Sequence, residues 1–224
     1  MIARVHRTMP GPFARVVTLA ALGVALVVSA AAAMDAPSPS FLEDWPGTSL
    51  QGWGGGAELD NPGTGGVGGA GDGFLLVSTP FPAHLGTNSM GSEYAGDWIA
   101  ARITIVRLWL NDVNAAEPLE IHFAIGNAFN FWEYNVGFAP PKNAWQEFIV
   151  DLSGSTNFTQ IIGQGSFEAA LHAVDRIHLR HDVAPFIHSP DLMKGDFGID
   201  RLELTNDAVP VQRVSFGRLK SLYR

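Results

Sequence analysis

One segment of the chain combines aromatic and asparagine side chains in a way that suits sugar binding. Residues 129–135 hold four aromatic rings and two asparagines, namely Phe129, Asn130, Phe131, Trp132, Tyr134 and Asn135. Tryptophan and tyrosine rings stack on the apolar faces of sugars, and amide groups fix the orientation of the ligand. In an extended strand Trp132 and Tyr134 face one side and Phe131 the other. Trp132 and Tyr134 therefore either form a ligand-binding platform, with Asn130 and Asn135 beside them, or belong to the core.

A second segment carries imidazole and guanidinium groups. In a strand over 177–182, His178, Arg180 and Asp182 share one face, His181 lies on the other, and His188 follows soon after. Such a face resembles the floor of jelly-roll polysaccharide lyases, which need a charge neutraliser and a proton acceptor. The chain has only three tyrosines and lacks the closely spaced carboxylates of a sandwich glycosidase. These absences count against an enzyme, and catalysis by His178 and Arg180 is kept as an alternative. Zinc binding by His178, His181 and His188 is disfavoured because the first two point to opposite faces.

Both segments belong to a chain in which turns are predicted at short intervals. Glycine (25 residues) and proline (14 residues) are abundant, and both interrupt helices. Short apolar or alternating runs predict about eight strands, over residues 41–45, 73–78, 99–110, 119–125, 131–138, 145–152, 177–182 and 197–204. Residues 50–73 form a glycine-rich loop region. This pattern predicts an all-β fold with an antiparallel β-sandwich or jelly roll.

Two short helices are expected beside the strands. Ser166 can cap a helix over 167–174, with Glu168 in the first turn, where the helix dipole favours a negative charge. The second helix is predicted in a basic C-terminal tail over 208–224, in which Phe216, Leu219 and Leu222 fall at helical spacing. The tail is either a docking or sorting tag, or a helix that folds back on the domain.

Residues 1–33 have the three parts of a secretory signal peptide. Arg4, Arg7 and Arg15 make its start basic, and residues 16–33 carry no charge and end in small side chains. We expect cleavage after Ala33, a linker over 34–40, a sandwich domain over 41–207 and no stable membrane span afterwards. An uncleaved anchor is the alternative, because a run of about 18 mostly apolar residues approaches the length that spans a membrane. The expected destination is the periplasm, the cell surface or the medium.

Removal of the signal peptide leaves an acidic domain. All 22 acidic residues follow it, together with 11 of the 14 basic residues, which gives a net charge of −11. Nucleic acid is therefore a poor partner, because its phosphates need a basic surface. The chain has no cysteine, so neither disulfide bonds nor a lipid-modified cysteine are expected.

Several short motifs follow one another in an informative order. In chain order they are Phe41-Leu-Glu-Asp44 with Gly52-Trp53, Asp72-Gly-Phe-Leu75, Leu85-Gly86 with Tyr94-Ala-Gly-Asp-Trp98, Trp145 to Leu152, and Val174-Asp-Arg-Ile177 with Gly198-Ile-Asp-Arg-Leu202. Their order resembles that of bacterial extracellular sandwich domains of the laminin-B-like and carbohydrate-binding-module type. The resemblance covers residues 41–205. It implies a jelly roll of the galactose-binding-like type that binds sugars or other surface proteins.

The resemblance also implies a calcium ion that ties the first strand, a loop and the last strand together. The matching positions are Glu43 or Asp44 near the start, Asp60 and Asp72 in the loop region, and Asp200 in the last strand. Calcium takes roughly six to eight oxygen ligands, and the glycines of the loop let carbonyl groups converge at little steric cost. The alternative is that Asp60 makes a turn and that Asp200 points outward from its strand.

Together these features predict a secreted, non-catalytic binding module for glycan or cell-envelope polysaccharide. Two further classes remain open. One is a structural or adhesive surface protein that docks a cell-surface component through its C-terminal tail. The other is a jelly-roll polysaccharide lyase or hydrolase.

Overall fold

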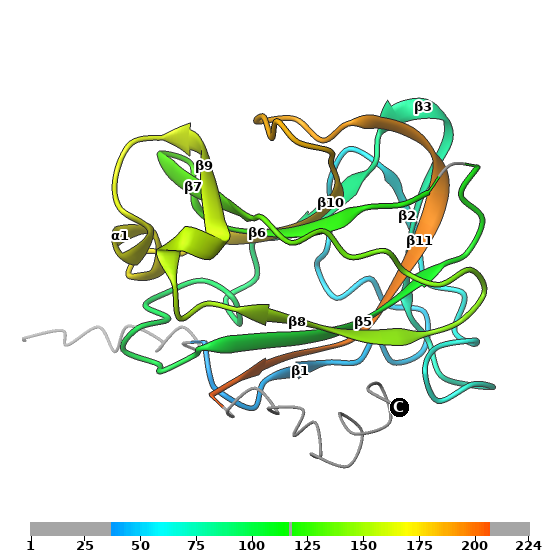
Figure 1. Cartoon of the computed structure of the whole chain (residues 1–224). Coiled ribbons are helices and arrows are strands. Elements are labelled where there is room, and N and C mark those ends of the chain that lie inside the picture. The colour runs from blue at the N-terminus through cyan, green and yellow to red at the C-terminus, as the bar shows by residue number, and fades with distance from the viewer. Residues whose placement is uncertain (1–36, 117, 207–224) are drawn as a thin grey trace, which may run out of the picture. The chain divides into compact units, whose positions relative to one another are not determined.

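The computed structural model describes residues 37–116 and 118–206 of the 224-residue chain. They form two antiparallel sheets that lie one above the other (Figure 1). The predicted antiparallel β-sandwich is therefore confirmed. The predicted signal peptide and the predicted C-terminal helix fall outside the described residues.

One sheet has six strands, in the order β2-β3-β11-β5-β8, with β1 paired to β11. These strands are β1 (Leu42–Glu43), β2 (Glu58–Asp60), β3 (Leu75–His84), β5 (Ile105–Asp112), β8 (Gln146–Asp151) and β11 (Leu192–Thr205). Val106, Leu108 and Leu110 alternate along β5 and are completely buried, because every second side chain of a strand faces the opposite sheet.

The other sheet has five strands, in the order β4-β10-β6-β7-β9. They are β4 (Gly86–Ser89), β6 (Ile121–Asn127), β7 (Asn130–Tyr134), β9 (Phe158–Gly163) and β10 (Arg176–His181). Ile177 and Leu179 of β10 belong to the core between the sheets. His178 and Arg180 alternate with them and therefore lie on the outer face of this sheet.

The ends of the sandwich are closed by loops and one short helix. α1 (Phe167–Leu171) begins after Ser166, whose hydroxyl accepts a hydrogen bond from Ala169 N at 3.1 Å. This cap and the acidic Glu168 in the first turn confirm the predicted start of the helix. The Phe167 ring stacks on Phe158 with a centroid distance of 4.2 Å. A single 3-10 turn, η1 (Ser155–Asn157), precedes β9.

Three strands were not predicted from the sequence, namely β2, β4 and β9. β4 reads Gly-Thr-Asn-Ser and offers neither alternation nor β-branched apolar residues. It forms because its backbone pairs with β10, where Asn88 lies opposite His178.

A bulge in β11 shapes the surface of the six-stranded sheet. The register with β5 shifts between Asp200 and Glu203, and Arg201 has a φ of +45°. Bulges re-aim neighbouring side chains. Here the bulge follows Asp200, which lies fully buried beneath the glycine-rich loop region. None of the described helices is long and apolar enough to cross a membrane.

Candidate functional site

The outer face of the five-stranded sheet carries a small polar recess. It has a volume of about 180 Å³ and is lined by β4, β10 and the segment that follows β10. Asn88, His178, Arg180 and His188 supply its main polar side chains. A recess of this composition can donate hydrogen bonds to a ligand and accept them from it.

Arg180 fixes one wall of this recess. Its Nε donates to Oδ2 of Asp182 at 2.5 Å, and Nη1 and Nη2 donate to the carbonyl oxygens of His188 (2.9 Å) and Ile187 (2.6 Å). The Arg180 side chain is only 1% exposed. These charge-assisted bonds hold the segment that carries His188 against the sheet, so the recess is formed before any ligand arrives.

A second carboxyl group balances the charge of Arg180. Oε2 of Glu133, on β7, lies 3.5 Å from Nε of Arg180, and Glu133 is completely buried. Burial raises the pKa of Glu133 although Arg180 opposes the rise, and the Asp182 carboxylate adds to it. Burial also raises the pKa of Asp182. The two carboxyl groups therefore favour sharing one proton, which leaves a single negative charge against Arg180.

His178 is held neutral at the floor of the recess. Burial, together with the neighbouring positive charges of Arg180 and Arg176, lowers its pKa to about 3. Its ring lies 4.7 Å from the ring of Phe131. A neutral imidazole offers one donor and one acceptor nitrogen, which suits contact with the hydroxyl groups of an uncharged ligand.

The aromatic platform predicted for β7 is not formed. Tyr134 is 7% exposed and packs against Phe158 at 5.0 Å, while the Trp132 ring packs against Phe167 at 5.7 Å. Both therefore point into the core, as in the other alternative drawn from the sequence. Phe131 faces outward but is also only 1% exposed. The sheet is covered on both sides here, so alternation alone could not identify the accessible face.

The two predicted asparagines are occupied by contacts within the chain. Asn130 is buried, donates to Ser166 O at 2.9 Å and accepts from Nε2 of Gln160 at 2.6 Å. Asn135 is exposed, and its Oδ1 accepts from the Thr159 hydroxyl at 2.6 Å. Asn130 thus joins α1, β7 and β9, and neither residue lines the recess described above.

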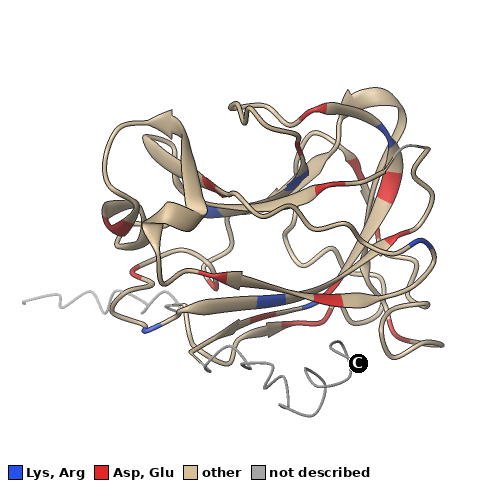
Figure 2. Cartoon of the chain, in the orientation of Figure 1, with Lys and Arg blue, Asp and Glu red and all other residues tan. Residues whose placement is uncertain are grey.

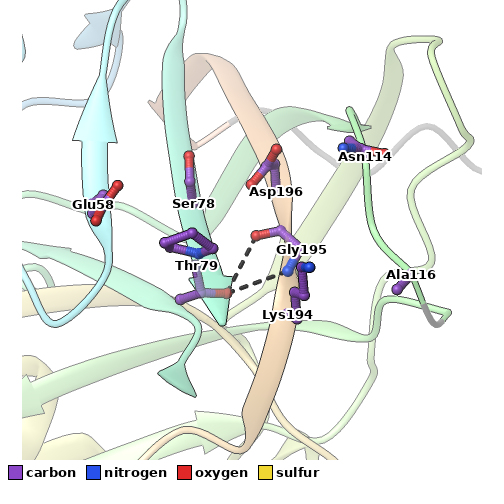
Figure 3. A pocket seen from close by; sticks show the side chains of 9 residues that line it. Glu58, Ser78, Thr79, Asn114, Ala116, Lys194, Gly195 and Asp196 are labelled. Carbon is purple, nitrogen blue, oxygen red and sulfur yellow. Dashed lines mark hydrogen bonds between the residues drawn. The ribbon is translucent and has the colours of Figure 1, made fainter. Parts of the chain in front are cut away.

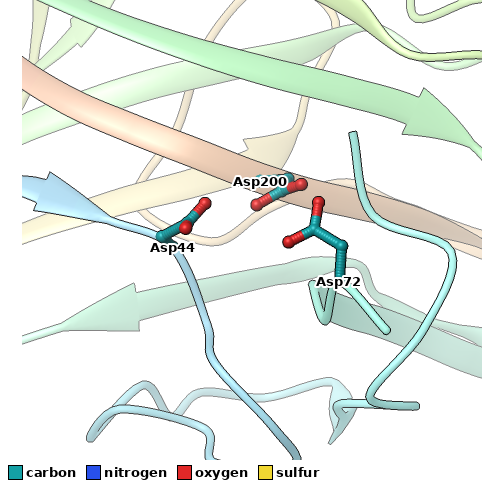
Figure 4. A group of neighbouring side chains, drawn as sticks. All are labelled: Asp44, Asp72 and Asp200. Carbon is teal, nitrogen blue, oxygen red and sulfur yellow. The ribbon is translucent and has the colours of Figure 1, made fainter. Parts of the chain in front are cut away.

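Three of the predicted calcium ligands come together at the edge of the glycine-rich loop. Carboxylate oxygens of Asp44, Asp72 and Asp200 lie within 4.8 Å of one another (Figure 4). Oδ2 and Oδ1 of Asp200 accept hydrogen bonds from Val67 N (2.7 Å) and Arg201 N (2.8 Å). Burial nevertheless raises the pKa of Asp200 to about 6, and the nearby Asp72 and Asp44 carboxylates add to the rise.

The surroundings of this aspartate group suit a hard cation. A Cβ on Gly66 would lie 2.5 Å from the carbonyl oxygen of Gly73 and 2.8 Å from Oδ2 of Asp200, so only glycine fits among these oxygens. Oδ1 of Asp44 has no hydrogen-bond partner among the described residues, and its ion-pair partner there is Nε of Arg201, at 3.8 Å. Carboxylate and carbonyl oxygens are the ligands that calcium prefers. The donor set therefore fits the ion that the resemblance implies.

The other two predicted ligands lie elsewhere. Glu43 is the last residue of β1, and its side chain lies beside Tyr94, which donates its hydroxyl to Oε2 at 3.3 Å. Burial raises the pKa of Glu43 to about 7. Asp60 is exposed and pairs with Leu76 of β3. Neither belongs to the aspartate group.

The lyase alternative gains no support from the geometry. Arg180 donates its hydrogen bonds to Asp182 and to carbonyl groups of the chain, so it does not project toward a substrate as a charge neutraliser would. His181 lies on the other side of β10 from His178, and its Nδ1 accepts from Glu120 N at 3.1 Å. The sequence singled out His178 as a candidate for catalysis and missed Asn88, because β4 was not predicted.

Charged residues are scattered over the sandwich. Lysines and arginines lie apart from one another on both sheets and on the loops, with acidic residues between them (Figure 2). The described surface thus presents no basic stripe along any one strand.

Comparison with known proteins supports the fold. No protein-family model matches the sequence, and no curated protein matches it either. Among solved structures, a family 11 carbohydrate-binding module from Clostridium thermocellum, in complex with a β-1,3-1,4-mixed-linked tetrasaccharide, superimposes with a TM-score of 0.51 at 16% identity. The match covers 76% of this chain and 96% of that one.

Two further structures share the architecture. The solution structure of the module CtCBM11 matches with a TM-score of 0.50 at 20% identity, over 78% of this chain and 99% of that one. An exo-β-agarase matches with a TM-score of 0.54 at 12% identity, over 77% of this chain but only 26% of the agarase. The laminin-B-like part of the predicted resemblance stays a prediction. The chain has the β-sandwich fold found in carbohydrate-binding modules.

Proposed function

We propose that this protein is a non-catalytic carbohydrate-binding module. The observation that carries the proposal is the preformed polar recess on the outer face of the five-stranded sheet, with His178 at its floor. A sandwich of the same fold is found in complex with a β-1,3-1,4-mixed-linked tetrasaccharide, which makes a glycan the ligand class to test first.

The chemistry of the recess is consistent with an uncharged polyol. Asn88 and the neutral His178 each offer a donor and an acceptor, whereas the charge of Arg180 is balanced by Asp182. Hydroxyl groups of a sugar both donate and accept hydrogen bonds, so a set of paired donors and acceptors can fix its orientation.

Affinity electrophoresis tests this proposal. The protein is run in native gels that contain soluble β-glucan, xylan or galactan, together with Asn88→Ala, His178→Ala and the exposed control Asn135→Ala. We expect at least one polysaccharide to retard the wild type and Asn135→Ala, and the two recess variants to migrate freely. If the folded wild type is retarded by none of them, the proposal fails.

We further propose that the module is exported, with residues 1–33 as a cleaved signal peptide. The support is the basic start, the uncharged stretch over 16–33 and the small residues before Met34. Expression of the full chain in a Gram-negative host tests it. N-terminal sequencing of periplasmic protein should show a start at or near Met34, and full-length protein in the membrane fraction would contradict it.

We also propose that Asp44, Asp72 and Asp200 hold a structural calcium ion. The ion would tie β1, the glycine-rich loop and β11 together, at three places that are far apart in the sequence. It would stabilise the fold without touching the proposed sugar recess, because the two lie on different sheets.

A further inference from the structure

A larger recess lies over the outer face of the six-stranded sheet (Figure 3). Its volume is about 610 Å³, and it is formed by β2, β3, β11 and the segment after β5. Sites for small ligands commonly measure about 300 to 1,000 Å³. This recess belongs to the opposite sheet from the one proposed above to bind glycan.

The floor of the recess is a row of three oxygen-bearing side chains. Glu58 of β2 and Asp196 of β11 both pair in register with Ser78 of β3. Adjacent strands lie about 4.8 Å apart, so the two carboxyl groups flank the Ser78 hydroxyl from either side. Figure 3 shows these three side chains side by side on neighbouring strands.

Three polar side chains of the lining have no partner within the described chain. Among residues 37–116 and 118–206, neither Glu58 nor Lys194 has an ion-pair partner, and no hydrogen bond engages the Asn114 side chain. Thr79 is different, because its hydroxyl is bonded to the backbone of Gly195 (Figure 3). The free groups are therefore an acceptor, a strong donor and an amide that offers both.

This composition selects the chemistry of a ligand. Pro80 and Ala116 are the only apolar side chains in the lining, so an apolar molecule would gain little. With two carboxyl groups against one lysine, the lining repels anions such as uronates. A carboxylate oxygen pair accepts readily from adjacent hydroxyl groups, while Lys194 and Asn114 donate to hydroxyl or ring oxygens.

We propose that this recess is a second carbohydrate site, which binds a neutral sugar unit through adjacent hydroxyl groups over Glu58, Ser78 and Asp196. With one site on each sheet, the module would bind two separate glycan chains. The inference stands on its own residues and does not require the recess on the five-stranded sheet to bind.

Backbone amide NMR of the full chain can locate binding on each sheet separately. The probes are cellotetraose, xylotetraose and a galactotetraose at millimolar concentration, with tetragalacturonate as the anionic contrast and calcium chloride alone as the ion control. The variants are Glu58→Gln, Asp196→Asn and their combination. Glu147→Gln, on β8 at the opposite edge of the same sheet, is the matched control.

We expect a neutral tetrasaccharide to shift the amides of residues 58, 78 and 194–196, and the double variant to weaken that binding at least tenfold. Glu147→Gln should leave it unchanged. Shifts confined to residues 86–89 and 176–181 would overturn this inference and leave the proposed function standing. Shifts at residues 58, 78 and 194–196 alone would support this inference and overturn the proposed function of the recess on the five-stranded sheet. No shifts on either sheet would overturn both, and shifts at 58 and 196 with calcium alone would show a cation site instead.

Discussion

Removal of calcium at different pH values gives the most searching test of the aspartate group. Burial raises the pKa of Asp200 from its ordinary value of 3.8 to about 6. Without metal, the folded carboxyl therefore holds its proton more tightly than the unfolded one. The corresponding stability is complete below about pH 4 and is lost as the pH rises through 6.

The size of this effect follows from the rise in the pKa. A rise from 3.8 to about 6 corresponds to about 3 kcal/mol of unfolding free energy. Calcium at the proposed site would reverse this pH dependence, because the ion would bind the ionised carboxylates. A free ion concentration of 100 times the Kd would add about 2.7 kcal/mol. The protein should thus lose stability toward neutral pH in chelator and regain it in calcium.

Urea denaturation between about pH 4 and pH 7, in chelator and in millimolar calcium, measures both effects. The wild type in chelator should lose about 3 kcal/mol more than Asp200→Asn over this range, and calcium should stabilise the wild type but not Asp200→Asn. Asp60→Asn is the matched control and should behave as the wild type, because Asp60 lies outside the group. If calcium leaves the unfolding of the wild type unchanged at pH 7, the calcium site is refuted. If the wild type and Asp200→Asn show the same pH profile in chelator, the buried-carboxyl reasoning is refuted.

Four further outcomes follow from the packing. Tyr134→Ala should destabilise the fold by about 3 kcal/mol, as loss of a core aromatic does, whereas Phe129→Ala, at a ring that is 82% exposed, should change urea stability by less than about 0.5 kcal/mol. Ser166→Ala should cost about 1 kcal/mol through loss of the helix cap, and equal stability in urea would contradict that role. Arg180→Met should cost about 3 to 5 kcal/mol, because it leaves a buried charge without its partner; a smaller loss than Ser166→Ala would show that the network is dispensable. The wild type should lose unfolding free energy between about pH 4.5 and pH 7, because the raised pKa of Glu43 favours the folded state only below 7. Glu43→Gln should make this loss smaller, and an unchanged pH profile would count against the burial effect.

The fold was largely predictable because its long strands carry clear patterns. β5 and β6 are rich in buried aliphatic residues, and such runs between turn signals predict strands. β4 was missed because a Gly-Thr-Asn-Ser run has no periodicity and becomes a strand only through pairing with β10. The start of α1 was predictable because a cap is a local feature, confined to Ser166 and the first turn.

The sites were predictable only in part, because each depends on segments far apart in the chain. The sequence alone brings Asp44, Asp72 and Asp200 together only through the resemblance, since no local pattern links a first strand to a last one. The aromatic platform predicted for β7 failed for another reason. Phe131 and Tyr134 are buried on opposite faces of β7, and Trp132 is half-buried against Phe167, so none of them forms an open platform. The recess lies instead two strands away, where a segment after β10 folds over the sheet.

A crystal structure of the protein with the oligosaccharide of whichever polysaccharide retards it most would test the proposed function most directly. We expect the sugar to lie on the outer face of the five-stranded sheet, in hydrogen-bond contact with Asn88 and His178. Two results together would contradict the proposal. The recess would be empty in the crystal, and binding of the same oligosaccharide in solution would involve neither Asn88 nor His178.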